Sequence, residues 1–242
     1  MDFPSDLKTG VLLKRYKRFF ADILYEGQVL TAHVPNTGSL KGCLSPEAPC
    51  EFTLNEDPKR KLKATLHFIK TPTSWVGVDT SLPNTLVWEA FQLKKFPHWH
   101  SYSGGHREAK ISKSTRLDMV LWKTPPHPSG KWSMEYLDQG PFRFVEVKNV
   151  TLAEDGVALF PDAKTERGQK HLSEMMELVQ QGHEAELVFT VQRQDCKSLK
   201  PADDIDPEYG RLLREASKAG VQISAFAFEK GPKSLRLHPA PL

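Results

Sequence analysis

The chain has 242 residues, of which 39% are hydrophobic and 26% charged, and its formal net charge is +3. This composition is that of a soluble globular protein, and no apolar run reaches the roughly 20 residues that a membrane span requires. The first ten residues carry acids and lack the apolar core of a signal peptide, so we expect a cytoplasmic protein. Three cysteines fit a reducing compartment, and without a second Cys pair they do not predict a zinc site.

Basic residues are concentrated in two runs, 8–18 and 94–116, the first without any acid and the second with Glu108 alone. Aromatic residues are interleaved with these cations: Tyr16, Phe19, Phe20, Trp99 and Tyr102. Proteins that bind single strands grip phosphates with cations and stack bases on rings, so the runs predict a polyanion partner. A solvated basic surface explains them about equally well.

The first third of the chain reads as short strands broken by turn residues. The expected strands are residues 9–16, 19–24, 28–33, 50–55, 62–70 and 74–79. Because no helix interrupts them, we expect a small barrel of the OB type, which suits a basic, aromatic terminus. Residues 33–38 form a sharp loop that contains Asn36, where Gly38 permits either close approach of a ligand or an ordinary turn.

The character of the sequence changes at residues 79–82, so we predict two domains, 1–80 and 81–242. Ser81 is the expected N-cap of a helix with a buried apolar stripe, and Glu89 lies at the rim of that stripe, either solvated or directed at a neighbouring site. Residues 96–113 are expected to form loop and edge structure. His98 and His100 lack further metal ligands at suitable spacing, and we expect them to be solvated and to contact phosphate.

Two strands, 116–122 and 142–152, carry the most informative polar residues. Side chains two apart in a strand share a face, so Glu146 and Lys148 lie together among apolar neighbours, and Asp118 shares a face with Val120 and Trp122. An Asp in the middle of such a strand is unfavourable without a function. An irregular hairpin between the two strands would place Asp118 beside Glu146 and Lys148.

Two carboxylates and an ammonium are the groups that a divalent metal needs at a phosphate. The carboxylates of Asp118 and Glu146 would hold Mg²⁺ or Mn²⁺, and Lys148 would orient a water molecule or neutralise the developing charge. The alternative interpretation of Glu146 and Lys148 alone is a salt bridge on a half-exposed strand, which is the more common situation.

The remainder alternates helix and strand. We expect a helix over 163–181 whose polar first turn favours anions, a strand over 184–193, a helix capped by Asp206 and a last strand over 221–228. The strand–helix–strand order predicts a parallel pair with a right-handed crossover. Arg193 ends one of these strands near the expected site.

Several long segments, in order, resemble the sugar fermentation stimulation protein A family. They are GVLLKRYKRFFADI at 10–23, HVPNTGSLKG at 33–42, RLDMVL at 116–121, FVEVKNVTL at 144–152, FPDAKTERGQKHL at 160–172 and VFTVQRQD at 188–195. The resemblance implies an N-terminal OB-like β-barrel followed by a PD-(D/E)xK nuclease-like α/β domain with a mixed central sheet. Asp118, Glu146 and Lys148 match the nuclease motif and Glu89 its helix acid, although Leu117 replaces the usual Pro before the Asp.

The resemblance implies a non-specific DNA-binding protein with a regulatory link to sugar (maltose) metabolism. The alternative is a nuclease that uses Mg²⁺ or Mn²⁺ to hydrolyse the phosphodiester bonds of DNA or RNA. The residues expected to contact nucleic acid, DNA rather than RNA, are Lys14, Arg15, Tyr16, Lys17, Arg18, Asn36, Arg116, Arg167, Lys170 and Arg193. Strand preference and oligomeric state stay open.

Overall fold

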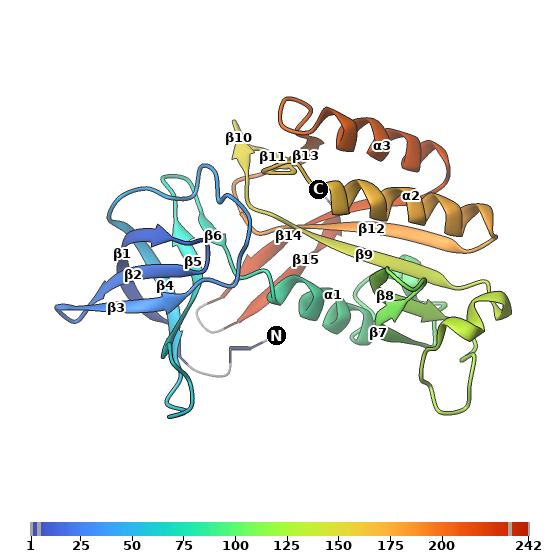
Figure 1. The fold of residues 1–242 in the computed structure, drawn as a ribbon, viewed down its shortest axis with the longest axis horizontal. Helices are drawn as coiled ribbons and strands as arrows, with labels where there is room; N and C mark the ends of the chain where they lie inside the picture. Colours follow the sequence, from blue (N-terminus) through green and yellow to red (C-terminus); the bar gives the residue numbers. More distant parts are fainter. Residues whose placement is uncertain (1, 4–5, 232–233, 242) are drawn as a thin grey trace.

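A small closed barrel forms the N-terminal part of the computed structural model, which describes residues 2–3, 6–231 and 234–241 (Figure 1). Its strands are β1 (Lys8–Tyr16), β2 (Phe20–Tyr25), β3 (Gln28–His33), β4 (Ala48–Leu54), β5 (Ala64–Lys70) and the short β6 (Trp75–Gly77). The sheet order is β3-β2-β1-β4-β5-β6, and pairing of β3 with β5 closes the barrel. The OB-type barrel predicted from the sequence is confirmed.

Alternation of apolar residues along these strands builds the barrel core. Leu12, Ile23, Phe52 and Leu66 are buried inside it, each from a different strand. At Gly10 a Cβ atom would lie 2.6 Å from the side chain of Ile23, so only glycine lets β1 approach β2 this closely.

The second part is an α/β domain built on a mixed sheet of order β15-β14-β12-β9-β8-β7. The strands are β7 (Gly104–Lys110), β8 (Arg116–Trp122), β9 (Arg143–Val150), β12 (Glu184–Val191), β14 (Gln222–Lys230) and β15 (Leu235–Pro241). Strands β9, β12 and β14 are parallel, whereas β7, β8 and β15 are antiparallel to their neighbours. A separate small sheet contains β10 (Ala153–Glu154), β11 (Val157–Phe160) and β13 (Ser198–Pro201).

Helices cover both faces of the mixed sheet (Figure 1). The helices α2 (Glu166–Gln180) and α3 (Pro207–Lys218) pack on one face, and α1 (Leu82–Gln92) packs on the other, next to the short 3₁₀ helix η1 (Pro97–Trp99). A second 3₁₀ helix, η2 (Met134–Gln139), lies in the connection between β8 and β9. The central strand β9 therefore has one helical layer on each side, and its two sets of alternating side chains enter two separate cores.

The edge structure expected within residues 96–113 is the strand β7, at one edge of the mixed sheet. Two other local expectations were wrong. The strand β15 follows the strand expected to be last. The Ser81 side chain makes no capping hydrogen bond, because Asp79 Oδ1 accepts from the Ser81 backbone N–H at 2.9 Å and from its hydroxyl at 2.6 Å. By contrast Asp206 caps α3 as expected, accepting from the backbone N–H of Tyr209.

Polar contacts join the barrel to the α/β domain. The carboxylate of Asp162 accepts hydrogen bonds from Ser39 Oγ at 2.9 Å and from the Leu40 backbone N–H at 3.2 Å. The Gly77 N–H donates to the Gln192 carbonyl at 2.9 Å, and a Cβ on Gly77 would clash with the Gln192 side chain at 2.3 Å. Within the described ranges, no helix is long and apolar enough to cross a membrane.

Candidate functional site

The candidate site lies where β8 and β9 separate. Met119 and Val145 are the last paired residues of the β8–β9 ladder. Beyond them, β9 donates a backbone hydrogen bond to the Asp118 side chain. Asp118 Oδ2 accepts a hydrogen bond from the backbone N–H of Val147 at 2.7 Å, and Oδ1 accepts from Asn84 Nδ2 of α1 at 2.6 Å. Hydrogen bonds from β9 and from α1 therefore fix the orientation of the Asp118 carboxylate.

Glu146 and Lys148 point from β9 toward α2, on the shared face that strand alternation predicts. Lys148 Nζ lies 2.6 Å from Glu146 Oε1, and His171 Nδ1 of α2 lies 2.5 Å from the same oxygen. The other oxygen, Oε2, is buried, and no donor in the described part of the chain reaches it. Because buried carboxylate oxygens are normally satisfied, this one is an acceptor that awaits a ligand.

The two carboxylates differ in their electrostatics. Burial and the nearby charge of Glu146 raise the pKa of Asp118 to about 7, against the opposing hydrogen bond from Val147. Burial also disfavours ionisation of Glu146, but the hydrogen bond from His171 and the charge of Lys148 outweigh it, and its pKa is lowered. Two carboxylates that resist simultaneous ionisation are stabilised by a cation between them.

The donor set fits a hard divalent cation. Mg²⁺ and Mn²⁺ prefer carboxylate oxygen ligands, which Asp118 and Glu146 provide. The unsatisfied Oε2 of Glu146 is free to coordinate such a cation. Among the residues placed by the structure, no cluster of three His, Cys, Asp or Glu side chains is arranged for a metal. A cation held by one or two carboxylates keeps several waters or substrate oxygens, which is how Mg²⁺ is usually bound at phosphates.

A basic pocket of about 540 Å³ opens beside these residues. The β7–β8 hairpin, at its turn and the adjoining strand ends, and the first turns of α2 supply its cations: Lys110, Lys113, Arg116, Arg167 and Lys170. His171 also lines this pocket, and Arg167 Nε donates to His171 Nε2 at 3.4 Å. One imidazole thus contacts both the pocket and Glu146. We call this pocket the basic pocket.

The structure brings together six of the residues that the sequence singled out. Asp118, Glu146 and Lys148 converge where β8 and β9 separate, and Arg116, Arg167 and Lys170 line the basic pocket. Sequence reasoning missed Asn84 and His171. The His171 position in the polar first turns of an expected helix was visible, but nothing in the sequence showed that this helix lies over β9.

Glu89 is not part of this group. It lines a different cavity, with Glu229 and Arg236 of the strands beyond β12, and Asn84 is the α1 residue that contacts Asp118. Glu89 follows Asn84 by five positions on α1, so the directions of the two side chains around the helix axis differ by more than a third of a turn. Glu89 therefore cannot point toward Asp118 as Asn84 does.

Two arginines among the expected nucleic-acid contacts donate hydrogen bonds to backbone carbonyls. Arg15 donates from Nη2 to the carbonyls of Asn36 at 2.8 Å and Gly38 at 2.9 Å, which fixes the loop. Arg193 is buried, pairs with Asp195 at 2.8 Å and donates to the Thr151 carbonyl at 3.1 Å.

Four of the other expected contacts in the barrel lie nearer the surface, whereas Asn36 is buried. Lys17 and Arg18 are exposed in the turn between β1 and β2, and exposed Lys14 lies 3.3 Å from Asp22. The Tyr16 ring stacks on Phe20, with centroids 5.6 Å apart. Asn36 is buried, donates to the Val78 carbonyl at 2.9 Å and accepts from the Gly38 N–H at 2.7 Å.

Comparison with known proteins adds an independent line of observation. The model of the sugar fermentation stimulation protein RE domain matches residues 81–234, and the SfsA N-terminal OB domain model matches residues 13–78. Sugar fermentation stimulation protein homologs from Bdellovibrio bacteriovorus and Geobacter sulfurreducens are 52% and 43% identical, and each alignment covers 98% of this chain and 96% of the relative. A solved structure, described as Pyrococcus furiosus SfsA in complex with Ca²⁺, shares the fold with a TM-score of 0.84 at 24% identity, covering 100% of this chain and 96% of the other.

Proposed function

The chain belongs to the sugar fermentation stimulation protein family, and we propose that it binds nucleic acid, DNA in preference to RNA, through the basic pocket. Five cations face one acid, Glu108, in a pocket formed by a hairpin turn and a helix N-terminus. Phosphates bind well to such a combination, because side-chain cations and free helical N–H groups both attract anions. The binding would be insensitive to sequence, since contacts to phosphate carry little base information.

A second function, metal-dependent phosphodiester hydrolysis, is favoured by one observation. The unsatisfied Oε2 of Glu146 lies in a site shared with Asp118 and Lys148, and His171 connects this site to the basic pocket. In this proposal Asp118 and Glu146 hold Mg²⁺ or Mn²⁺. When bound, the cation would polarise the phosphate and lower the pKa of a coordinated water.

The chain's own residues would perform the remaining tasks. Lys148, with Nζ 2.6 Å from Glu146, would stabilise negative charge at the phosphate, and His171 would hold Glu146 in position. Arg167 and Lys170, predicted from the sequence as nucleic-acid contacts, would orient the flanking phosphates. The Pyrococcus furiosus protein, described as a complex with Ca²⁺, supports a divalent cation in this family, and the choice of Mg²⁺ or Mn²⁺ is our proposal.

One experiment separates binding from hydrolysis. Labelled single- and double-stranded DNA and RNA are incubated with the protein in Mg²⁺, in Mn²⁺ or in chelator, beside Asp118→Asn and Glu146→Gln. Metal-dependent products that disappear in both variants would identify a nuclease and its substrate. Salt-dependent binding without products would leave a nucleic-acid-binding protein, and absence of binding would contradict both functions. The regulatory link to maltose metabolism stays a prediction of the family resemblance.

A further inference from the structure

A second pocket, with no lining residue in common with the basic pocket, lies between α1, η1 and the start of β7. Its volume is about 400 Å³, and four aromatic rings line it: Trp88, Phe91, Trp99 and Tyr102. We call it the aromatic pocket. Phe91 and Trp99 are in edge contact with centroids 6.1 Å apart, and Trp88 is tilted on Phe91 at 5.4 Å. Trp88 is the partly exposed member of this set, so its ring is the surface available to a ligand.

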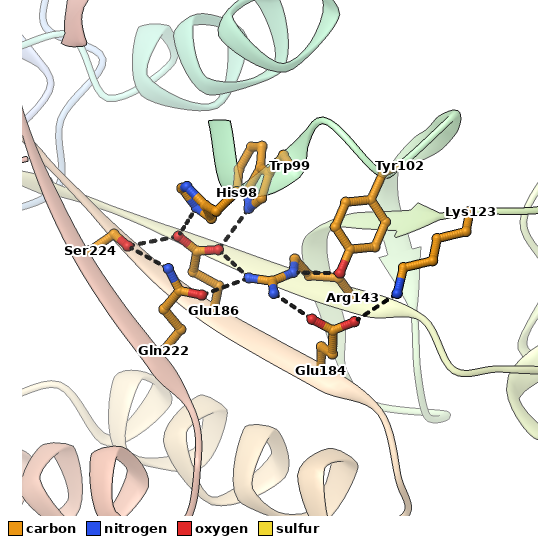
Figure 2. A network of polar contacts seen from close by, with 9 residues as sticks. All are labelled: His98, Trp99, Tyr102, Lys123, Arg143, Glu184, Glu186, Gln222 and Ser224. Atoms are coloured by element: carbon orange, nitrogen blue, oxygen red, sulfur yellow. Dashed lines mark hydrogen bonds and ion pairs between the residues drawn. The ribbon is translucent and has the colours of Figure 1, made fainter. Parts of the chain in front are cut away.

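Two of the other rings, Trp99 and Tyr102, are fixed from behind by a buried polar network, shown in Figure 2. Trp99 Nε1 donates to Glu186 Oε2 at 2.7 Å, and Tyr102 Oη accepts from Arg143 Nε at 2.9 Å. Arg143 also pairs with the same Glu186 oxygen at 2.6 Å. The second Glu186 oxygen accepts from Ser224 at 2.7 Å and contacts His98 at 3.1 Å.

This network leaves neither buried charge unpaired, which makes it rigid rather than reactive. The Glu186 side chain is fully buried and each of its oxygens has two partners. Rings locked in this way present a preorganised wall, and a preorganised wall loses little conformational entropy when a flat ligand stacks against it. The sequence placed Trp99 and Tyr102 beside cations, and the structure shows them as the buried wall of a pocket.

One cation and one amide line the aromatic pocket, and a second cation lies near one of its rings. Lys94 and Gln92 are exposed lining residues. Lys123 is outside the lining, with its Nζ 5.7 Å from the centroid of the Tyr102 ring. Lys123 also contacts Glu184 at 3.8 Å, so its charge is only partly balanced at an exposed position. A ligand that is flat, has hydrogen-bonding edges and carries negative charge beside the ring would satisfy all of these groups.

We propose that the aromatic pocket binds a nucleobase of a single-stranded nucleic acid, stacked on Trp88, with Lys94 and Lys123 near the adjoining phosphates. The proposal rests on the proposed nucleic-acid binding and adds a second point of contact to it. The Gln92 amide can donate and accept hydrogen bonds at a base edge. A duplex hides its bases, so this subsite selects unpaired strands.

The edge strand β7 connects the two sites. Gly104 lines the aromatic pocket and Lys110 lines the basic pocket, at opposite ends of β7. Seven residues of strand span about 20 Å, which corresponds to about six nucleotides at the stacked spacing of one phosphate per 3.4 Å. At this spacing a strand of three nucleotides is too short to occupy both sites, so affinity should rise steeply between three and twelve nucleotides.

The test compares oligodeoxyadenylates of 3 and 12 nucleotides, and a 12-residue abasic strand, in binding to the wild type, Trp88→Ala and Trp88→Phe. Fluorescence anisotropy in chelator measures each affinity without cleavage. We expect Trp88→Ala to weaken binding of the 12-mer about tenfold, Trp88→Phe to restore most of it, and the abasic strand to bind all three proteins alike. Leu93→Ala, a neighbouring exposed apolar position outside the pocket, should bind like the wild type.

Two results would overturn the proposal. If Trp88→Ala binds the 12-mer as tightly as the wild type while Arg167→Gln weakens it, the base subsite is absent and nucleic-acid binding at the basic pocket stands. If the wild type binds none of these strands, both the subsite and the proposed function fail. An equal loss of base-bearing and abasic strands in Trp88→Ala would also reject stacking if this variant keeps the melting temperature of the wild type. If its melting temperature falls, the fold is damaged, and the same comparison is made with Trp88→Phe.

Discussion

The Nδ1 atom of His171 lies 2.5 Å from Oε1 of Glu146, so a helix on one face of the sheet holds the orientation of a carboxylate on its central strand. The same nitrogen is 3.5 Å from Lys148 Nζ. Partners that orient metal ligands typically contribute a factor of about 10 to 100 in metal affinity.

His171→Ala is therefore expected to weaken Mn²⁺ binding by about 10- to 100-fold, since Glu146 loses the donor that fixes it. The measurement is the rise in melting temperature during titration with Mn²⁺, which reports the dissociation constant by mass action. His127→Ala, an exposed position in the β8–β9 connection, is the matched control. Equal Mn²⁺ titration curves for wild type and His171→Ala would refute the positioning role.

The raised pKa of Asp118, about 7, predicts how stability depends on pH. The folded carboxyl keeps its proton up to that pH, whereas an unfolded Asp releases it near pH 4, so the folded state binds more protons between these values. The contribution of Asp118 to the free energy of unfolding is consequently present at low pH and lost as the pH rises toward 7.

Asp118→Asn removes this titration, and the variant should gain stability over the wild type as the pH rises from 5 to 8. Urea denaturation in chelator at three pH values measures the difference. A difference that stays constant across this range would contradict the raised pKa.

The basic pocket should account for part of the salt dependence of nucleic-acid binding. Arg167→Gln and Lys170→Gln each remove one cation from its wall, and each should reduce the slope of log affinity against log salt by about 1 on duplex DNA. Arg211→Gln is the control, because Arg211 is exposed on α3 and paired with Glu208 and Glu215. Slopes that are unchanged in all three variants would place the binding surface elsewhere.

The buried network behind the aromatic pocket should be a major source of stability. Glu186→Gln leaves the charge of Arg143 without its fully buried partner, although Glu184 still pairs with it. We expect a loss of about 3 kcal/mol in the free energy of unfolding, the low end for breaking a buried pair. Glu184→Gln, at a side chain that is 39% exposed, should lose less than about 1 kcal/mol. Urea denaturation compares them, and equal losses would show that burial of Glu186 contributes nothing.

The sequence predicted those features that depend on local periodicity. Side-chain alternation in β9 put Glu146 and Lys148 on one face. The unusual position of Asp118 in an apolar strand indicated a special role, and in the structure its carboxylate accepts a hydrogen bond from the Val147 N–H. The barrel and the α/β domain were likewise predictable from strand and helix patterns and from family resemblance. The bounds 1–80 and 81–242 stay a prediction.

Features that depend on distant partners could not be predicted. Trp99 packs in an apolar cluster, where Glu186, 87 positions later, accepts its indole N–H. Arg15 donates to loop carbonyls more than 20 positions away, and Glu89 and Asn84 were distinguishable only once the rotation of α1 over the sheet was known. The sequence shows which residues have suitable side-chain chemistry, and tertiary packing determines which of them come into contact.

The contacts of Asp162 have a consequence for protein engineering. Asp162 receives hydrogen bonds from the barrel loop at Ser39 and Leu40 only four positions before α2 begins, and α2 carries Arg167 and His171. Grafting another barrel onto this α/β domain would remove the anchor of the segment that leads into that helix. A chimera would therefore need to keep the 36–40 loop as the partner of Asp162, because the two halves of the chain are not interchangeable modules.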